Sequence, residues 1–146
     1  MRTASPAKLA FASLAFVAVA TLSSCTPGQT AGDSAKAQVG VAYAVGGSTP
    51  ASGFDCSGLT SWAWAKAGLT IPRTAAAQYS ASRRITKAEL QPGDLVFYGF
   101  GGKVSHVAMY VGGGQIVHAQ KAGVPVNVQS VEWWATNRIG FGRISG

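Results

Sequence analysis

The sequence predicts one α+β domain in which short helices come first and an antiparallel sheet follows. Helix-like spacing of apolar residues is confined to the part of the chain between residues 35 and 82, whereas β-branched or aromatic runs broken by glycine-rich turns begin at residue 94. Strands and helices do not alternate, which argues against a Rossmann-type nucleotide fold. A length of 146 residues suits one hydrophobic core rather than two.

The first 24 residues have the pattern of an export signal. Arg2 and Lys8 precede and open an apolar run of 14 residues at positions 9–22, which is shorter than the ~20 residues of a transmembrane helix. The run ends in Leu22-Ser23-Ser24-Cys25, which resembles a bacterial lipobox. We therefore expect residues 1–24 to be removed and Cys25 to carry a lipid that anchors the exported protein to a membrane. The alternatives are an ordinary signal peptide with an incidental cysteine and a buried apolar helix.

The segment after this cysteine is polar, and residues 26–34 contain one proline and two glycines, a composition typical of a flexible spacer. We interpret residues 25–35 as the lipidated cysteine and its tether, and residues 36–146 as the folded domain, which we expect to be monomeric. Residues 25–146 hold ten basic and five acidic side chains, a net charge of +5. This charge favours an anionic partner, and composition alone leaves nucleic acid, lipid headgroups and cell-wall polymers open.

The beginning of the domain offers one weak helix and one loop. Residues 35–44 are a candidate short helix, although Gly40 and two valines lower its helix propensity. Residues 45–53 are rich in glycine and serine and contain a proline, so they are predicted to form a loop.

The strongest helix prediction covers residues 56–67. Apolar side chains recur there at helical spacing, Asp55 is a suitable N-cap, and Gly68 is a suitable C-terminal stop. Residues 74–82 are predicted to form a second short helix.

Five runs in the second half of the chain are predicted to be strands of an antiparallel sheet of about five to six strands. They are residues 94–100, 104–111, 115–120, 124–128 and 139–144. The segment Gly112-Gly113-Gly114 is predicted to connect the second and third runs as a hairpin. Trp133 and Trp134 lie between the last two runs, in a predicted helical turn.

Cys56 stands at the predicted start of a helix. Backbone N–H groups and the positive end of the helix dipole are expected to stabilise a thiolate there, and also an oxyanion on a carbonyl that the sulfur attacks. Gly58 in the first turn is expected to allow close approach of another backbone or of a substrate. A cysteine with histidines elsewhere in an exported chain is a candidate nucleophile. The alternative is a small buried cysteine of the core.

His106 and His118 flank the predicted hairpin turn. Counted outward from Gly113, they stand seven residues before it and five after it, a diagonal offset of two. Neighbours at this offset on one sheet face lie within reach, so one imidazole can hold the other as in a catalytic triad. Two ordinary strand residues are the alternative. Zinc is a further alternative, but the spacing of these histidines and Cys56 matches no metal signature, and we expect no metal.

No feature of the sequence marks a nucleic-acid or nucleotide site. The basic residues are scattered, and their one local cluster, Arg83, Arg84 and Lys87, is typical of a solvated surface. The glycine-rich loops lack the Lys-Ser/Thr pair of a phosphate loop. We therefore expect no nucleic-acid partner and no cofactor.

Six short motifs follow one another through the domain. They are Tyr43–Gly47 (YAVGG), Gly53–Leu59 (GFDCSGL), Ile71–Thr74 (IPRT), Leu90–Phe97 (LQPGDLVF), Ser105–Gly112 (SHVAMYVG) and Ile116–Ala119 (IVHA). Together they resemble the NlpC family of papain-like bacterial cell-wall cysteine peptidases, over about residues 36–145.

The resemblance implies a papain-like α+β fold, with the nucleophile at the N-terminus of a helix that packs against the antiparallel sheet. It implies Cys56 as nucleophile, His106 as general base and later acid, and His118 as the residue that orients His106. Four further positions match residues that line the family's site: Tyr43, Asp55, Ser57 and Ser105. Arg73 belongs to one of the matching motifs and is expected to contribute to substrate binding. Val45 departs from the family pattern, which commonly has an aromatic residue at that position.

The resemblance also implies a substrate, the stem peptide of bacterial peptidoglycan. The bond expected to be hydrolysed joins γ-D-glutamyl to a diamino acid, through an acyl-enzyme. The competing hypotheses are a non-catalytic wall-binding lipoprotein with the same fold and an amidase or acyltransferase with the same three residues. A toxin directed at other bacteria fits less well, because a lipid anchor would hold it on its own envelope.

Overall fold

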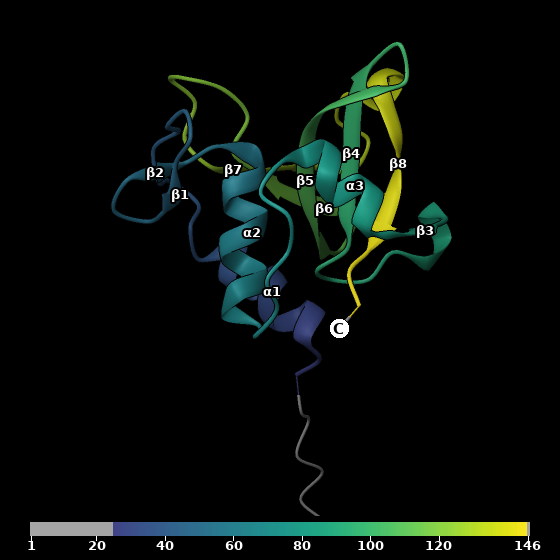
Figure 1. Ribbon diagram of the computed structural model, residues 1–146, viewed down its shortest axis with the longest axis horizontal. Coiled ribbons are helices and arrows are strands. Elements are labelled where there is room, and N and C mark those ends of the chain that lie inside the picture. Colours follow the sequence, from purple (N-terminus) through teal and green to yellow (C-terminus); the bar gives the residue numbers. More distant parts are fainter. Residues whose placement is uncertain (1–24, 146) are drawn as a thin grey trace, which may run out of the picture.

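The structure, a computed structural model, describes residues 25–145 and confirms the α+β class (Figure 1). The expected export signal, residues 1–24, lies outside the described residues. The helices are α1 (Pro27–Lys36), α2 (Cys56–Lys66) and α3 (Ala75–Ala81). A small sheet pairs β1 (Ser48–Thr49) with β2 (Gly53–Phe54). The main antiparallel sheet consists of β3 (Arg83–Ile85), β4 (Leu95–Phe100), β5 (Lys103–Gly112), β6 (Gln115–His118), β7 (Asn127–Ser130) and β8 (Arg138–Arg143).

The helices are gathered beside the main sheet, whose strand order is β3-β8-β4-β5-β6-β7. Helices α1 and α2 contact each other, and all three helices contact β5 (Figure 1). A helix packed against an antiparallel sheet is the arrangement that the sequence predicts. Within the described residues, no helix is long and apolar enough to cross a membrane.

Helix α1 occupies the segment predicted to be a flexible spacer, and that prediction is wrong. Thr26 caps the helix by accepting a hydrogen bond from the Gln29 N–H (3.1 Å), and Pro27 follows it at the first helical position. Ala31 and Ala35 are fully buried in the core. Contact with the rest of the domain therefore outweighs the poor helix propensity of the glycines in this segment. The predicted helix over residues 35–44 is also wrong, since the chain leaves the helix after Lys36.

Helix α2 confirms the strongest helix prediction. Asp55 caps it, and Gly68 follows its end with a φ of 89°, the left-handed conformation that favours glycine. Leu59 and Trp64 are buried against the sheet side of the core. Helix α3 begins and ends within one residue of its predicted bounds, 74–82, and Thr74 is its N-cap.

The strand predictions hold for β4, β5, β6 and β8 within a few residues, and Gly112-Gly113-Gly114 forms the predicted turn. The strand predicted at residues 124–128 is instead Asn127–Ser130. β3 was not predicted, because its two arginines suggest a solvated surface; it pairs with β8 at the edge of the sheet. Trp133 and Trp134 lie in a turn before a short 3₁₀ helix, Ala135–Asn137.

Both faces of the sheet centre are buried. On β4, Leu95 and Phe97 belong to the cluster that includes the helices, whereas Val96 and Tyr98 belong to a second cluster on the opposite face. Trp133 packs against this second cluster, so the turn segment covers the face that the helices leave open. Burial of both faces explains the continuous apolar run of β4.

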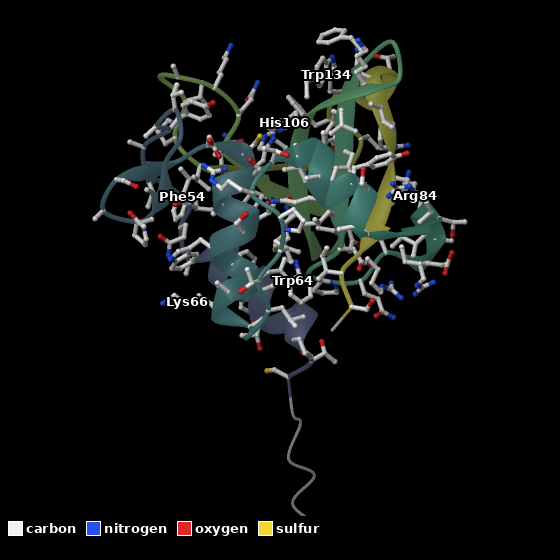
Figure 2. The ribbon with its side chains drawn as sticks, in the orientation of Figure 1. Phe54, Trp64, Lys66, Arg84, His106 and Trp134 are labelled. Atoms are coloured by element: carbon white, nitrogen blue, oxygen red, sulfur yellow. The ribbon has the colours of Figure 1, made fainter. Side chains whose placement is uncertain are left out.

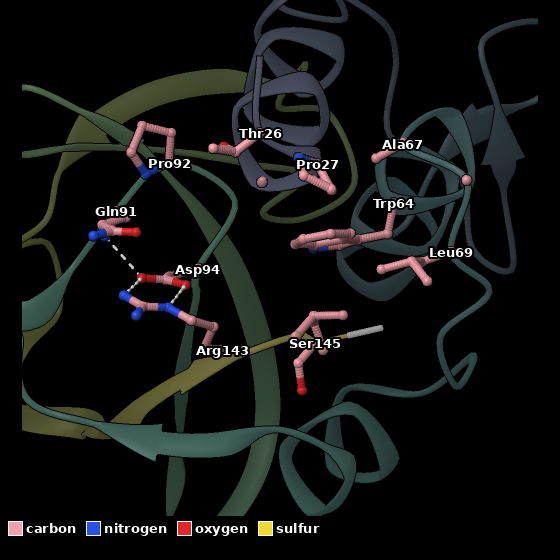
Figure 3. Close-up of a pocket in the computed structure, with 13 residues that line it drawn as sticks. Thr26, Pro27, Trp64, Ala67, Leu69, Gln91, Pro92, Asp94, Arg143 and Ser145 are labelled. Atoms are coloured by element: carbon pink, nitrogen blue, oxygen red, sulfur yellow. Dashed lines mark hydrogen bonds and ion pairs between the residues drawn. The ribbon is translucent and has the colours of Figure 1, made fainter. Parts of the chain in front are cut away.

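A buried ion pair closes the end of the domain near the start of α1. Arg143 Nε donates to Asp94 Oδ1 (2.9 Å) and its Nη2 donates to Oδ2 (2.8 Å). The Gln91 N–H also donates to Asp94 Oδ2 (2.7 Å). Figure 3 shows this pair in the wall of a pocket of about 400 Å³, with the ring of Trp64 on another side. The pocket lies at the C-terminal end of α2, away from Cys56.

Candidate active site

Asp55 organises the start of α2. Its Oδ1 accepts a hydrogen bond from the Gly58 N–H (2.7 Å), and its Oδ2 accepts one from the Gly46 N–H (3.1 Å). Arg73 donates to both oxygens at 2.9 Å. Burial acts to raise the pKa of Asp55, but Arg73 and the two N–H groups outweigh burial and hold that pKa below its ordinary value. Asp55 thus fastens the first turn of α2 to the preceding loop and to Arg73.

The first turn of α2 is crossed closely by the loop before it. A Cβ on Gly58 would overlap the carbonyl oxygen of Gly47, so only glycine fits there. The close approach predicted for Gly58 is therefore confirmed. Arg73 bonds to the same turn through the Ser57 hydroxyl, at 2.9 Å.

Cys56 is the first residue of α2 and is partly buried. Burial raises the pKa of its thiol, backbone N–H groups of Val107 and Ser57 act to lower it, and the charge of Asp55 raises it further. The net direction is upward. The predicted stabilising effect of backbone N–H groups on a thiolate is present, since the Ser57 N–H acts to lower this pKa, but desolvation of the charged sulfur outweighs it. Because the Val107 N–H acts on this thiol, the sulfur lies close to β5 at Val107, the residue after His106.

Alkylation of Cys56 by iodoacetamide is expected to follow this raised pKa. The rate should keep increasing as the pH rises past the ordinary thiol value of 9.0, because only the thiolate reacts. Peptide mapping by mass spectrometry separates Cys56 from Cys25, and the urea-unfolded chain provides the control with an ordinary thiol. A rate for Cys56 that is already at a plateau below pH 7 would contradict a neutral resting thiol.

His106 on β5 and His118 on β6 form a hydrogen-bonded pair. His106 Nε2 and His118 Nδ1 are 2.8 Å apart. The register pairs Met109 with Val117, which centres the hairpin on Gly113 as predicted. The proximity predicted from the diagonal offset is therefore confirmed.

The histidine pair is buried and neutral. His118 is fully buried and His106 is 8% exposed. Trp133 lies against both, with ring centroids 4.5 Å from His118 and 5.6 Å from His106. Burial lowers the pKa of His106 to about 3, aided by His118, and lowers that of His118 to about 4. Because His106 Nε2 is hydrogen-bonded to His118, His106 Nδ1 is the ring nitrogen that can exchange a proton with another group.

A pocket of about 470 Å³ opens beside the histidine pair. Its lining residues are Ser105, His106, Gln120, Lys121, Trp133 and Trp134. Figure 2 shows His106 near the upper end of α2 and Trp134 higher up, beside the β4–β5 hairpin, where its ring packs against Tyr98 and Phe100. Trp134 is the one residue other than glycine with a positive φ (50°) in the described range 25–145. The pocket thus combines aromatic walls with one lysine ammonium group.

The structure gathers most of the predicted site residues. Tyr43 lies near Cys56. Burial is the largest cause that raises the pKa of Tyr43, and the charges of Cys56 and Asp55 raise it further. Arg73 donates a hydrogen bond to the Ser57 hydroxyl, and both side chains donate to the Asp55 carboxylate at the start of α2. Ser105 lines the pocket beside His106. Val45, at the position where an aromatic residue was expected, is 89% exposed.

Cys25 lies apart from these residues. It is exposed and stands two residues before α1, whose first residues share a pocket with Ala67 at the C-terminal end of α2. Cys56 begins α2, so the two cysteines lie toward opposite ends of this helix (Figure 1).

Gln78 is a buried positioning group that the sequence did not reveal. Its Nε2 donates to the Ser57 carbonyl (3.1 Å) and the Pro72 carbonyl (2.9 Å), and its Oε1 accepts from the Thr60 hydroxyl (2.7 Å). These bonds tie α3 to the first turn of α2. The sequence feature that could have indicated this role is the single side-chain amide, that of Gln78, in the alanine-rich helix predicted at residues 74–82. Among residues 25–145, no group of three or more His, Cys, Asp or Glu side chains is placed to hold a metal ion.

This arrangement has a counterpart among known proteins. The sequence model of the NlpC/P60 family matches residues 40–143. The chain belongs to the NlpC/P60 family. The matched range contains Cys56, His106 and His118, together with every predicted substrate-site residue, and it excludes Cys25.

Two curated relatives show how far the likeness of this NlpC/P60 domain extends. Probable endopeptidase p60 of Listeria monocytogenes is 44% identical over 110 residues, which are 75% of this chain and 22% of the relative. The bifunctional muramidase/DL-endopeptidase CwlT of Bacillus subtilis is 44% identical over 108 residues, which are 72% of this chain and 33% of that protein. The chain thus spans between about a fifth and a third of the length of these relatives.

Solved structures of the family agree with the fold. An NlpC/P60 family protein from Bacillus cereus covers 80% of the chain with a TM-score of 0.74 and 30% identity, and 39% of that structure is matched. The NlpC/p60 domain of the peptidoglycan hydrolase SagA covers 80% of the chain with a TM-score of 0.71 and 36% identity, and 98% of it is matched. The predicted NlpC fold is therefore confirmed.

Proposed function

We propose that this NlpC/P60 domain is a cysteine peptidase that hydrolyses an amide bond in the stem peptide of peptidoglycan. The observation that carries the proposal is the meeting of Cys56, at the start of α2, with β5 beside a His106–His118 pair bonded at 2.8 Å. A nucleophile, a base and a group that orients the base are the parts of a catalytic triad. The names of p60 and CwlT, both endopeptidases, support the same chemistry.

Acylation is the first proposed step. The thiol of Cys56 and the imidazole of His106 are neutral at rest, so His106 Nδ1 takes the S–H proton as the sulfur attacks the carbonyl carbon. A bond forms between Sγ and the carbonyl carbon. The amide C–N bond then breaks, and His106 gives its proton to the leaving amine. The products of this step are a thioester on Cys56 and a free amine.

Deacylation is the second step. His106 takes a proton from water, the water oxygen bonds to the thioester carbon, and the S–C bond breaks. The proton on His106 then returns to the sulfur, which restores the neutral thiol. The Gly58 N–H is taken by Asp55, so the N–H of Cys56 itself, at the open end of α2, is the donor that we assign to the substrate oxyanion.

The two sides of the scissile bond are assigned from the proton transfers. His106 protonates the leaving amine, so the amine side of the substrate belongs in the pocket of about 470 Å³ that His106 lines. Lys121 in this pocket suits the carboxylate of a diamino acid. Tyr43, Asp55 and Arg73 then lie toward the acyl side, which suits a γ-D-glutamyl residue and the residue before it.

We further propose that Cys25 is lipidated after removal of residues 1–24 and holds the domain on a membrane facing the cell wall. Two observations support this: the lipobox-like sequence and the exposure of Cys25, which stands two residues before α1. Because α1 is part of the packed domain, the anchor has no long flexible spacer. The 11 residues of α2 separate the anchor end from Cys56 by about 16 Å.

Digestion of purified muropeptides with defined stems tests the proposed bond. Mass spectrometry should find a new amine on the diamino acid and a new γ-carboxyl on D-glutamate. Cleavage between the sugar and the peptide would indicate an amidase instead, and transfer of the acyl group to an added amine would indicate an acyltransferase. Binding of muropeptides without any cleavage would favour a non-catalytic wall-binding lipoprotein.

A further inference from the structure

Two buried polar atoms lie on neighbouring residues behind the histidine pair. Within the part of the chain that the structure describes, His118 Nε2 and Asn127 Oδ1 are buried and have no hydrogen-bond partner. Their residues are directly paired across β6 and β7. Side chains of directly paired residues emerge on the same face of the sheet, with Cβ atoms about 5 Å apart. One of the two atoms can donate and the other can accept, so each supplies what the other lacks.

The side-chain amide of Asn127 is held in one orientation. Its Nδ2 donates to the carbonyl oxygen of Pro125 at 2.9 Å. A carbonyl only accepts, so Nδ2 stands at Pro125 and Oδ1 is directed elsewhere. The pKa of His118 carries the same information, because burial lowers it while the Asn127 side chain acts to raise it, as an acceptor from an imidazole N–H does.

We propose that Asn127 is a positioning residue that accepts a hydrogen bond from the His118 Nε2–H and thereby selects the tautomers of both histidines. A neutral imidazole carries one N–H. With the proton on Nε2 of His118, its Nδ1 accepts from the Nε2–H of His106 across the 2.8 Å bond. His106 Nδ1 then holds a lone pair and is the base for Cys56. The reverse tautomer of His118, with Nδ1–H, would put the proton of His106 on Nδ1 and remove that base.

The importance of this bond for catalysis rests on the proposed function, but the tautomers can be measured without any substrate. In the wild-type chain with ¹⁵N-labelled histidine, NMR at pH 7 should show both histidines as neutral Nε2–H tautomers. In Asn127→Leu, His118 should move toward the Nδ1–H form. The kcat for muropeptides should fall about 10-fold or more with little change in KM, since substrate contacts are unaffected. Asn127→Asp keeps an acceptor and should restore the Nε2–H tautomer and most of the kcat.

Gln129→Leu is the matched control, because it makes the same amide-to-alkyl change on β7, two residues along. It should leave both tautomers and kcat as in the wild type. A wild-type spectrum with His118 protonated on Nδ1 would overturn the proposal, and so would an Asn127→Leu variant with unchanged tautomers. Nε2–H tautomers in a wild-type chain that cleaves no muropeptide would support the His118–Asn127 bond and contradict the proposed function alone.

Discussion

Replacing His106 with glutamine is expected to lower kcat/KM for muropeptide hydrolysis by about 10⁴, the order of loss typical of a triad member. Glutamine cannot take the Cys56 proton or protonate the leaving amine. The loss should appear in kcat, because His106 acts on the reacting atoms. His118→Gln should cost less, about 10², because His118 orients His106 through the 2.8 Å bond and does not itself touch the substrate bond.

The control for these variants is Lys103→Gln, which changes an exposed residue at the start of the same strand β5 and should leave the rate unchanged. Thermal unfolding of each variant separates loss of chemistry from loss of fold. A His106→Gln variant that is folded and retains more than about a tenth of the wild-type rate would contradict its role as base.

Replacing Arg143 with methionine is expected to lower the free energy of unfolding by about 3 kcal/mol, because breaking one partner out of a buried ion pair leaves the other charge uncompensated. The Asp94 side chain is 4% exposed. Among the described residues, the backbone N–H of Gln91 is the one hydrogen-bond donor that its carboxylate keeps when Arg143 is replaced. Urea unfolding followed by tryptophan fluorescence measures the loss.

Asp94→Asn should cost less than Arg143→Met. The Arg143 side chain is 24% exposed and can turn its charge toward water when the carboxylate is removed. Arg83→Met is the matched control, since Arg83 is exposed and pairs directly with Arg143 across β3 and β8. It should change the stability by no more than about 0.5 kcal/mol. A loss below about 1 kcal/mol for Arg143→Met would contradict the importance of the buried pair.

The parts of the site that follow local rules could be predicted from the sequence. Asp55 was identified as an N-cap because residue type and position relative to an apolar helix settle that role. The meeting of His106 and His118 was counted from a glycine turn, since the register of a tight hairpin is fixed by its turn. Cys56 was a candidate nucleophile from its place at a helix start, and the family resemblance assigned the separate roles of His106 and His118.

The parts that depend on distant contacts could not be predicted. Helix α1 is stable because its small residues admit another segment closely: a Cβ on Gly28 would meet the Pro92 carbonyl oxygen at 2.5 Å. The composition of residues 26–34 does not reveal that this segment packs against Pro92, so a helix could not be predicted there. The direction of the Cys56 pKa shift depends in the same way on burial by other elements.

The positioning role of Asn127 was not predicted, because the register of β7 against β6 could not be derived from the sequence. The loop between His118 and Asn127 is too long for its pairing to be counted from a turn, and the strand was expected three residues earlier. The pairing of His118 with Asn127 therefore emerges only from the folded sheet.

The most direct test of the central claim is to digest one muropeptide with equal amounts of the wild-type chain and Cys56→Ala, and to follow the products by mass spectrometry. We predict that the wild type releases a new amine-terminal fragment and that folded Cys56→Ala is slower by at least about 10⁴. The same products at a comparable rate from both proteins would contradict Cys56 as the nucleophile and, with it, the proposed mechanism.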